Sequence, residues 1–315
     1  INLNIGYNKQ LLPLYSDVVF YKRCPYIKQR HGNRTVYFNL TNAHWNKADL
    51  FYEQIGCGET KLTDHINYLI FGFWNPDNLV GTNVVDGAVE GLMRDQGYTF
   101  NILETIKNRY ITNEISPMLS IFGGASTVEN IGPYTLNPTD VVTQLIDFLK
   151  TEYTQDKIQS PTKYYYYDFF DGIDVDLENT DNKMQKWVID FTINLYDQLA
   201  ELYNFAKEKN TSFNKHENKF LISYAPQAPE FSTTDGRNNY VNIENTLTTK
   251  IDWYNIQFYN QGLLYNTNEL LFIDSGVRVA AKTAINQLIN SGIPSHKIVI
   301  GKNVRTQDAG KADAG

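Results

Sequence analysis

The most informative stretch of the chain is DGIDVDLENT, residues 171–180, in which four acidic side chains stand among residues typical of a buried strand. Alternate side chains of a β-strand share a face, so Asp174, Asp176 and Glu178 are expected together, opposite the three apolar residues between them. Neighbours on one face lie about 6.6 Å apart. Ionised carboxylates at that spacing repel in a low-dielectric site, which raises the pKa of at least one. The pattern therefore predicts a glutamic acid kept protonated near neutral pH.

The position of Glu178 adds to this prediction. It falls where the strand gives way to a following helix, and catalytic side chains of parallel barrels lie at the carboxyl ends of strands. Asp171 has the opposite parity, so we assign it a structural role in supporting the strand. Asp-rich stretches also bind Ca²⁺, but here Gly172 precedes the acids and apolar residues alternate with them, unlike an EF-hand loop. We expect neither a metal nor a cofactor.

Around this stretch, short apolar or aromatic runs alternate with segments of helical spacing. Apolar residues recur at steps of three and four over 182–210, 140–152 and 278–290, which predicts helices. Strand, helix, strand alternation from about residue 33 to 301 predicts an α/β fold with a parallel sheet. The seven strands are expected at 36–40, 66–73, 118–122, 169–177, 220–224, 253–258 and 297–300.

The length of 315 residues fits one large barrel or two ordinary domains. No linker or shift in composition marks a boundary between two domains. We therefore expect a single domain over residues 33–315. Residues 1–32 precede it as an extension to which we assign no role, with a possible extra strand at 18–21.

The net charge of −7 and the absence of a Lys/Arg block argue against nucleic acid and an anionic membrane surface as partners. No apolar run is long enough to span a membrane. The two cysteines, Cys24 and Cys57, can pair in an oxidising compartment but do not make a metal site. We expect a secreted protein, and a chain that starts at Ile1 with no signal peptide is then a mature or trimmed form.

The acidic stretch also carries a resemblance to a known family. Asp171-Gly-Ile-Asp174-Val-Asp176-Leu-Glu178 resembles the Asp-x-x-Asp-x-Asp-x-Glu signature of glycoside hydrolase family 18, the chitinase family, at all four acids. Three further segments resemble the family in the same order, over about residues 36 to 301, and the last two are closest to hevamine-like and related short bacterial and fungal chitinases. They are Ser120-Ile-Phe122-Gly123-Gly124, with Phe122 where a glycine often stands, Ala225-Pro226-Gln227, and Gln257-Phe258-Tyr259-Asn260.

The resemblance implies a (β/α)₈ TIM barrel and a retaining mechanism in which the substrate supplies the nucleophile, the exception to the scheme with two catalytic carboxylates. Glu178 would be the general acid and then the general base. Asp176 would accept the N–H of the 2-acetamido group and orient its carbonyl oxygen towards the anomeric carbon. Asp174 would share a proton with Asp176, and such a pair titrates as a unit.

Further site residues follow from the same resemblance. Tyr259 would donate its hydroxyl to the acetamido carbonyl, and Gln257, Asn260 and Gln227 would add polar contacts to the sugar. Gly123 and Gly124 would allow close backbone approach at the barrel mouth. Trp74, directly after the second of the seven strands, is our candidate for a subsite wall, whereas Trp187 and Trp253 are expected to pack in the core.

One part of the family pattern is missing. The barrel of the family needs an eighth strand, usually ending in a tryptophan beneath the reacting sugar. After Gly301 only KNVRTQDAGKADAG remains, with no tryptophan and no convincing strand. We expect a truncated sequence, with closure of the barrel by residues 1–32 or by a partner chain as alternatives.

The expected ligand is chitin or another oligosaccharide that contains N-acetylglucosamine. The first hypothesis is a chitinase that hydrolyses β-1,4-linked N-acetylglucosamine polymers. An endo-β-N-acetylglucosaminidase acting on N-glycans is the close alternative, because both use the acetamido group of one sugar. A non-catalytic lectin on the same barrel is the third hypothesis, and the intact Glu178 argues against it.

Overall fold

The computed structural model describes ten segments of the chain: residues 18–22, 34–38, 68–77, 116–123, 136–153, 164–177, 182–215, 218–232, 239–258 and 283–303. Seven strands in these segments form a parallel sheet in the order β2-β3-β4-β7-β8-β9-β10. They are β2 Arg34–Phe38, β3 Tyr68–Trp74, β4 Ser116–Phe122, β7 Gly172–Asp176, β8 Leu221–Tyr224, β9 Trp253–Gln257 and β10 Ile298–Asn303. All seven strands expected from the sequence are present.

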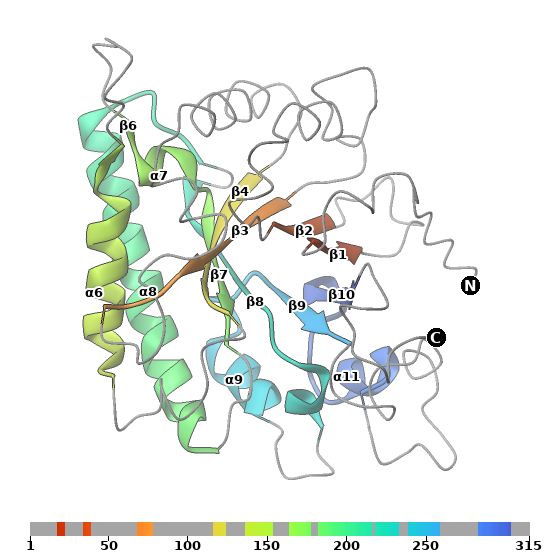
Figure 1. Ribbon diagram of the computed structural model, residues 1–315. Coiled ribbons are helices and arrows are strands. Elements are labelled where there is room, and N and C mark those ends of the chain that lie inside the picture. Colours follow the sequence, from red (N-terminus) through yellow and green to blue (C-terminus); the bar gives the residue numbers. More distant parts are fainter. Residues whose placement is uncertain are drawn as a thin grey trace, which may run out of the picture.

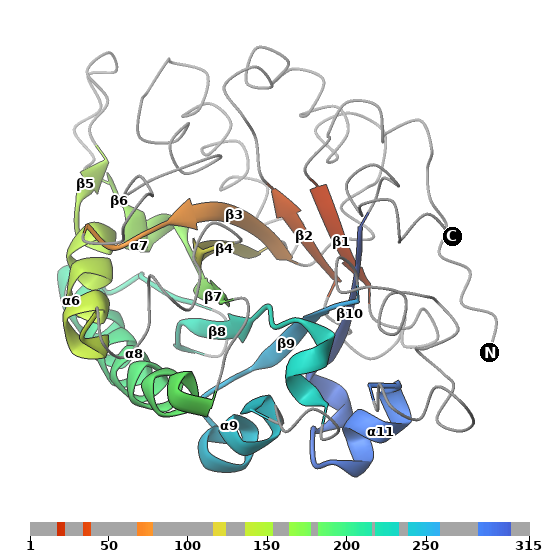
Figure 2. The same cartoon turned by 60° about the horizontal axis from the view of Figure 1, so that its bottom comes forward.

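An eighth strand, β1 Val18–Lys22, lies between the two edges of the parallel sheet. It pairs antiparallel with β10 and also antiparallel with β2, so the strands form a closed ring (Figure 2). The sequence suggested a missing eighth strand. In the structure that position is filled by residues of the N-terminal segment 1–32, which was one of the alternatives. No β-strand is left with an unpaired edge in this ring, which removes the aggregation hazard of an open sheet.

The described helices lie outside the ring (Figures 1 and 2). α6 Pro138–Leu149 starts two residues earlier than expected, because Asn137 accepts the Thr139 N–H at 2.9 Å and Pro138 suits the first turn. α8 Asn182–Lys209 agrees with the expected range. The remaining helical elements are α7 Tyr166–Phe169, η6 Ala228–Phe231, α9 Asn239–Leu247, α11 Ile285–Asn290 and η9 Ser295–Lys297.

Several of the predicted boundaries differ from those in the structure. The strand expected over 169–177 begins only at Gly172, because Tyr166–Phe169 form the short helix α7. Tyr164–Tyr165 form β6, which pairs antiparallel with β5 Glu152–Tyr153. The helix expected over 278–290 is described only as α11, since residues 278–282 lie outside the described segments and Thr283 and Ala284 are not helical.

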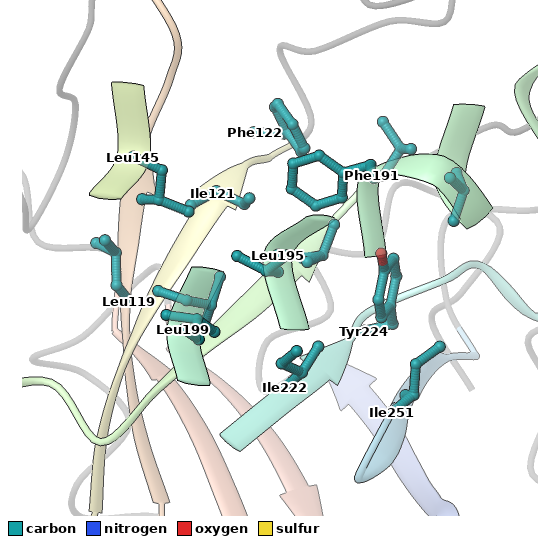
Figure 3. Close-up of a cluster of buried hydrophobic side chains, with 14 of the residues drawn as sticks. Leu119, Ile121, Phe122, Leu145, Phe191, Leu195, Leu199, Ile222, Tyr224 and Ile251 are labelled. Carbon is teal, nitrogen blue, oxygen red and sulfur yellow. The ribbon is translucent and has the colours of Figure 1, made fainter. Parts of the chain in front are cut away.

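The main hydrophobic core lies between the outer face of the sheet and the helices. Figure 3 shows part of it, where Leu119 and Ile121 of β4 and Ile222 of β8 meet Leu195 and Leu199 of α8. Burial of a side chain of this size stabilises the fold by about 1.5–3 kcal/mol. The outward-facing side chains of the central strands therefore pack against the helices. The inward-facing side chains of the same strands point into the ring.

A second, smaller apolar cluster fills one end of the ring interior. Trp253 of β9 packs on Tyr68 of β3 with ring centroids 4.5 Å apart. Ile70, Met118, Leu221 and Val299 belong to the same cluster, and all stand near the amino ends of their strands. Among the strands whose side chains are described, apolar side chains thus occupy the interior towards the amino ends, and the polar residues lie towards the carboxyl ends.

Candidate active site

The acidic residues of β7 alternate as the sequence predicts. Ile173 and Val175 pack in the core under the helices, so Asp174 and Asp176 face the interior of the ring. Asp174 is fully buried and Asp176 is 7% exposed. The register places Asp174 beside Ser120 of β4 and Ser223 of β8. The strand pairing therefore brings hydroxyl donors to the deeper carboxylate.

Asp174 accepts hydrogen bonds from three side chains on three other strands. Its Oδ2 accepts the Ser120 hydroxyl at 2.9 Å, and its Oδ1 accepts the Ser223 hydroxyl at 2.6 Å and the Asn255 amide at 2.9 Å. A carboxylate accepts hydrogen bonds through both of its oxygens, and these three donors offset part of the cost of burying it. The surroundings thus hold Asp174 in one orientation.

Asp176 lies one step nearer the carboxyl end of β7. Its Oδ1 accepts a hydrogen bond from Gln257 Nε2 at 2.9 Å, and the same nitrogen donates to the Ala225 carbonyl at 2.8 Å. Gln257 is buried and is joined to Gln227 by a parallel bridge. In this structure the Gln257 amide nitrogen therefore supports Asp176. Contacts of Gln257 and Gln227 with a sugar remain predictions.

Gly123 lies directly after β4, next to Asp176. Its N–H donates to the Asp176 carbonyl at 3.0 Å. Its φ is +81°, and a Cβ at this position would lie 2.9 Å from the Phe73 ring. Both the backbone conformation and the space therefore require glycine. Its neighbour Gly124 lies outside the described residues, and contact of either glycine with a sugar stays a prediction.

Asp171 stands at the start of β7, at the opposite end of the strand from the candidate site. Its carboxylate pairs with Lys215 at 2.9 Å, and its carbonyl accepts the Leu221 N–H at 3.0 Å. The Lys215 ammonium also lies over the Phe213 and Phe220 rings, at 5.3 and 5.6 Å from their centroids. These contacts tie the start of the strand to its surroundings, and the structural role assigned to Asp171 stays a prediction.

Three further predicted site residues, Glu178, Tyr259 and Asn260, lie outside the described residues. The description of β7 and its continuation ends at Leu177, and that of β9 and its continuation ends at Phe258. The roles assigned to these three side chains therefore stay predictions. Of the residues before them, Asp176 and Gln257 are described, and these two face the interior of the ring.

Trp74 does not lie where a subsite wall would need it. It is 2% exposed and packs against Phe148 of α6, with ring centroids 6.2 Å apart. The pairing of β3 with β4 shifts its register between Phe71 and Trp74. An extra residue moves the following side chains to the other face of a sheet. The shift turns Trp74 out of the ring and into the core, so this geometry offers no ring face to a sugar.

Trp187 and Trp253 were expected in the core, and both are buried there. Trp187 stacks on Phe191 at 5.1 Å and donates its indole N–H to the Leu136 carbonyl at 2.8 Å. Trp253 lies inside the ring and donates its indole N–H to Asn255 Oδ1 at 2.9 Å. The second contact links a core tryptophan to the polar network of Asp174.

The partners of Asp174 were not predicted from the sequence. Ser120 was quoted only as part of a motif, and Ser223 and Asn255 were not considered. A signal was present: Asn255 and Gln257 share a face of their strand, and so do Asp174 and Asp176. Polar residues at alternate positions of two buried strands in a barrel point into the same interior.

Among the described residues, no group of three or more His, Cys, Asp or Glu side chains is placed to hold a metal ion. No helix in the described segments is long and apolar enough to cross a membrane.

The comparisons with known proteins agree with this geometry. The family model described as "Glycosyl hydrolases family 18" matches residues 33–314. The chain belongs to this family. Its ring of strands with helices outside is the TIM barrel fold of family 18 proteins, here with one antiparallel strand in the ring.

Solved structures of family 18 proteins resemble this one. A chitinase from Pseudoalteromonas aurantia has 19% identity and a TM-score of 0.54, and the match covers 88% of this chain and 82% of that protein. Human YKL-39, described as a pseudo-chitinase with retained chitooligosaccharide binding properties, has 17% identity, a TM-score of 0.44 and coverage of 75% and 57%. An immunomodulatory active chitinase from Trichuris suis has 13% identity, a TM-score of 0.45 and the same coverage. Comparison with curated protein sequences gives no match.

Proposed function

We propose that this family 18 protein is a retaining glycosidase that hydrolyses β-1,4-linked N-acetylglucosamine polymers with assistance from the substrate. The observation that carries the proposal is the pair Asp174 and Asp176, stacked inside the ring and each held by its own amide. The four-acid motif that contains them is complete up to Glu178. Asp174 and Asp176 are the charged side chains in the described part of the site. A neutral sugar can bind there because its N–H and O–H groups can donate to carboxylates.

In this proposal Glu178 protonates the leaving glycosidic oxygen while the acetamido carbonyl oxygen of the substrate attacks the anomeric carbon. Asp176 accepts the acetamido N–H, which orients the carbonyl and stabilises the positive charge of the cyclic intermediate. Glu178 then removes a proton from the water that opens this intermediate, so configuration is retained. Tyr259 and Asn260 contact the same sugar. Because chitin lies outside cells, the proposal includes a secreted enzyme.

The proposal is tested with chitotetraose and a core N-glycan as parallel substrates. Release of reducing ends from chitotetraose supports a chitinase, and cleavage of the N-glycan alone supports an endo-β-N-acetylglucosaminidase. Binding of either glycan without cleavage supports a lectin, the role that the intact acidic motif disfavours.

The Glu178→Gln variant tests the mechanism. The amide keeps the size of the side chain but cannot give up a proton, so we expect turnover to fall by at least about 100-fold while oligosaccharide binding is retained. Asp190→Asn is the matched control, because this carboxylate lies on the surface of α8 in an ion pair with Lys186. Unchanged turnover in Glu178→Gln would contradict the assignment of the acid.

A further inference from the structure

Asn255 occupies the centre of the interior face of β9. It is fully buried between Trp253 and Gln257, the two side chains that share its face. Its Nδ2 donates to Asp174 Oδ1 at 2.9 Å and lies 3.5 Å from the Ser223 hydroxyl. Because β8 lies between β7 and β9, the amide reaches across one strand to the carboxylate.

The orientation of this amide is set by chemistry. The Trp253 indole N–H donates to Asn255 Oδ1 at 2.9 Å, and an indole can only donate. A flipped amide would point its NH₂ group at the indole N–H and its oxygen at the Asp174 carboxylate, which are two repulsive contacts. The Trp253 ring is itself held against Tyr68 at 4.5 Å. A rigid ring thus fixes which end of the amide faces Asp174.

We propose that Asn255 is a positioning residue of the active site, which acts through Asp174 and is oriented by the indole of Trp253. The inference rests on the proposed function, because it concerns the carboxylate behind Asp176 in the reaction. Asn255 touches no substrate atom in this scheme. It keeps Asp174 in one place, and Asp174 is the next side chain below Asp176 on the same face of β7.

The charged groups around Asn255 determine how a variant should behave. Asn255 bonds the carboxylate of Asp174, with Asp176 on the same face of β7, while β4 and β8 contribute the neutral Ser120 and Ser223. Tyr68 of β3 packs on the Trp253 ring. Tyr240 of α9 packs against Tyr224 and Tyr254, in the core on the helix side of β8 and β9. A carboxyl group in place of the amide would therefore face Asp174 directly.

Asn255→Asp is the decisive variant. Below the pKa of the new carboxyl its O–H can donate to Asp174 as the amide does, and above it two carboxylates repel each other. We expect kcat to approach that of the wild type at acidic pH and to fall as the pH rises, with the alkaline limb of the pH profile at least about one unit lower. Asn255→Leu removes the donor at every pH. Its kcat should fall by about 100-fold with little change in KM.

Trp253→Phe and Thr192→Val complete the set. Trp253→Phe keeps a ring against Tyr68 but removes the indole N–H, so kcat should fall less than in Asn255→Leu. Thr192 is equally buried and bonds the Tyr224 hydroxyl at 2.6 Å, but on the helix side of the sheet. Thr192→Val should keep the kcat and the pH profile of the wild type. An unchanged pH profile in Asn255→Asp, or an unchanged kcat in Asn255→Leu, would overturn the proposal.

A second measurement does not depend on turnover. The indole N–H signal of Trp253 in an NMR spectrum, assigned by its loss in Trp253→Phe, should move upfield in Asn255→Leu. In Asn255→Asp it should shift with pH at a midpoint absent from the wild type. If the wild type hydrolyses neither glycan, the proposed function fails, and this signal still tests whether the Trp253 indole orients Asn255. A signal unchanged in both variants would show that Asn255 does not bond the indole.

Discussion

Gly172, inside the acidic motif, has no space for a side chain. A Cβ there would lie 2.4 Å from the Leu221 carbonyl oxygen and 2.8 Å from the Leu221 Cβ. These two residues are partners in the pairing of β7 with β8, so neither backbone can move without breaking the ladder. We expect Gly172→Ala to lower the free energy of unfolding by about 2–3 kcal/mol, measured by denaturant titration.

Gly72 provides the control for this prediction. A Cβ at Gly72 would meet nothing within 4 Å, so Gly72→Ala should change the free energy of unfolding by no more than about 1 kcal/mol. Equal losses in the two variants would show that the close approach to Leu221 is not what requires glycine in the motif.

Phe122 and Trp74 show what the sequence could not tell at single positions. Phe122, which we expected at a position often taken by glycine, has a φ of +76°. Its ring packs on Trp187 and Phe191 at 6.1 and 5.9 Å. Burial of the ring, worth about 3–5 kcal/mol, outweighs a left-handed backbone that costs about 1–2 kcal/mol. The register shift in β3 places the Trp74 side chain on the outer face of the sheet instead of the inner one. The alternation of residues in the sequence does not reveal such a shift.

At the scale of elements, three tyrosines from β8, β9 and α9 fill the space between sheet and helices. Tyr224 donates its hydroxyl to Thr192, because the single Thr192 hydrogen goes to the Val188 carbonyl. Tyr254 donates to Glu244 at 2.8 Å, beside the buried ion pair of Glu244 with Lys297. The Tyr240 hydroxyl is buried without a hydrogen-bond partner in the described part of the chain. The Tyr240 hydroxyl therefore lowers the stability of the fold, whereas the hydrogen-bonded hydroxyls of Tyr224 and Tyr254 contribute to it.

The Tyr240→Phe variant should be at least as stable as the wild type. It removes a buried polar atom that gains no hydrogen bond on folding, so we expect the free energy of unfolding to rise by about 1 kcal/mol. Tyr224→Phe makes the same chemical change where the hydroxyl is bonded, and should lose about 1 kcal/mol. Denaturant titration of both variants checks the contrast. A loss in Tyr240→Phe as large as in Tyr224→Phe would indicate a partner for the Tyr240 hydroxyl.

The types of the main elements, and the side chains that face the interior of the sheet, could be predicted from hydrophobic periodicity. Periodicity is read from neighbouring residues in the sequence. All seven parallel strands and the faces of Asp174 and Asp176 were predicted correctly in this way. The network around Asp174 depends on which strands become neighbours, and sequence distance does not show that Ser120, Ser223 and Asn255 converge. Closure of the ring by residues 18–22 depends equally on long-range pairing, so it could be offered only as an alternative.

For the molecule as a whole, the buried tyrosines predict how stability depends on alkaline pH. Burial raises the pKa of Tyr224, Tyr240 and Tyr254 above its usual value, which is about 10. For Tyr240 the neighbouring Tyr224, Glu230, Asp176 and Asp174 raise it further. In the unfolded chain the same phenols ionise near pH 10. The folded state therefore binds more protons than the unfolded state above that pH.

The sign of the effect follows from this difference in proton binding. The contribution of each phenol is fully present below about pH 10 and is lost as the pH rises towards the higher pKa of the folded state. Each adds a slope of about 1.4 kcal/mol per pH unit to the fall in the free energy of unfolding. Denaturant titrations between about pH 10 and pH 11 should show this fall, and Tyr240→Phe should reduce its slope by one tyrosine. Tyrosinate absorbance of the folded protein provides the independent check, because these three phenols should ionise only when the protein unfolds. An identical slope in the wild type and in Tyr240→Phe would mean that Tyr240 already ionises in the folded protein.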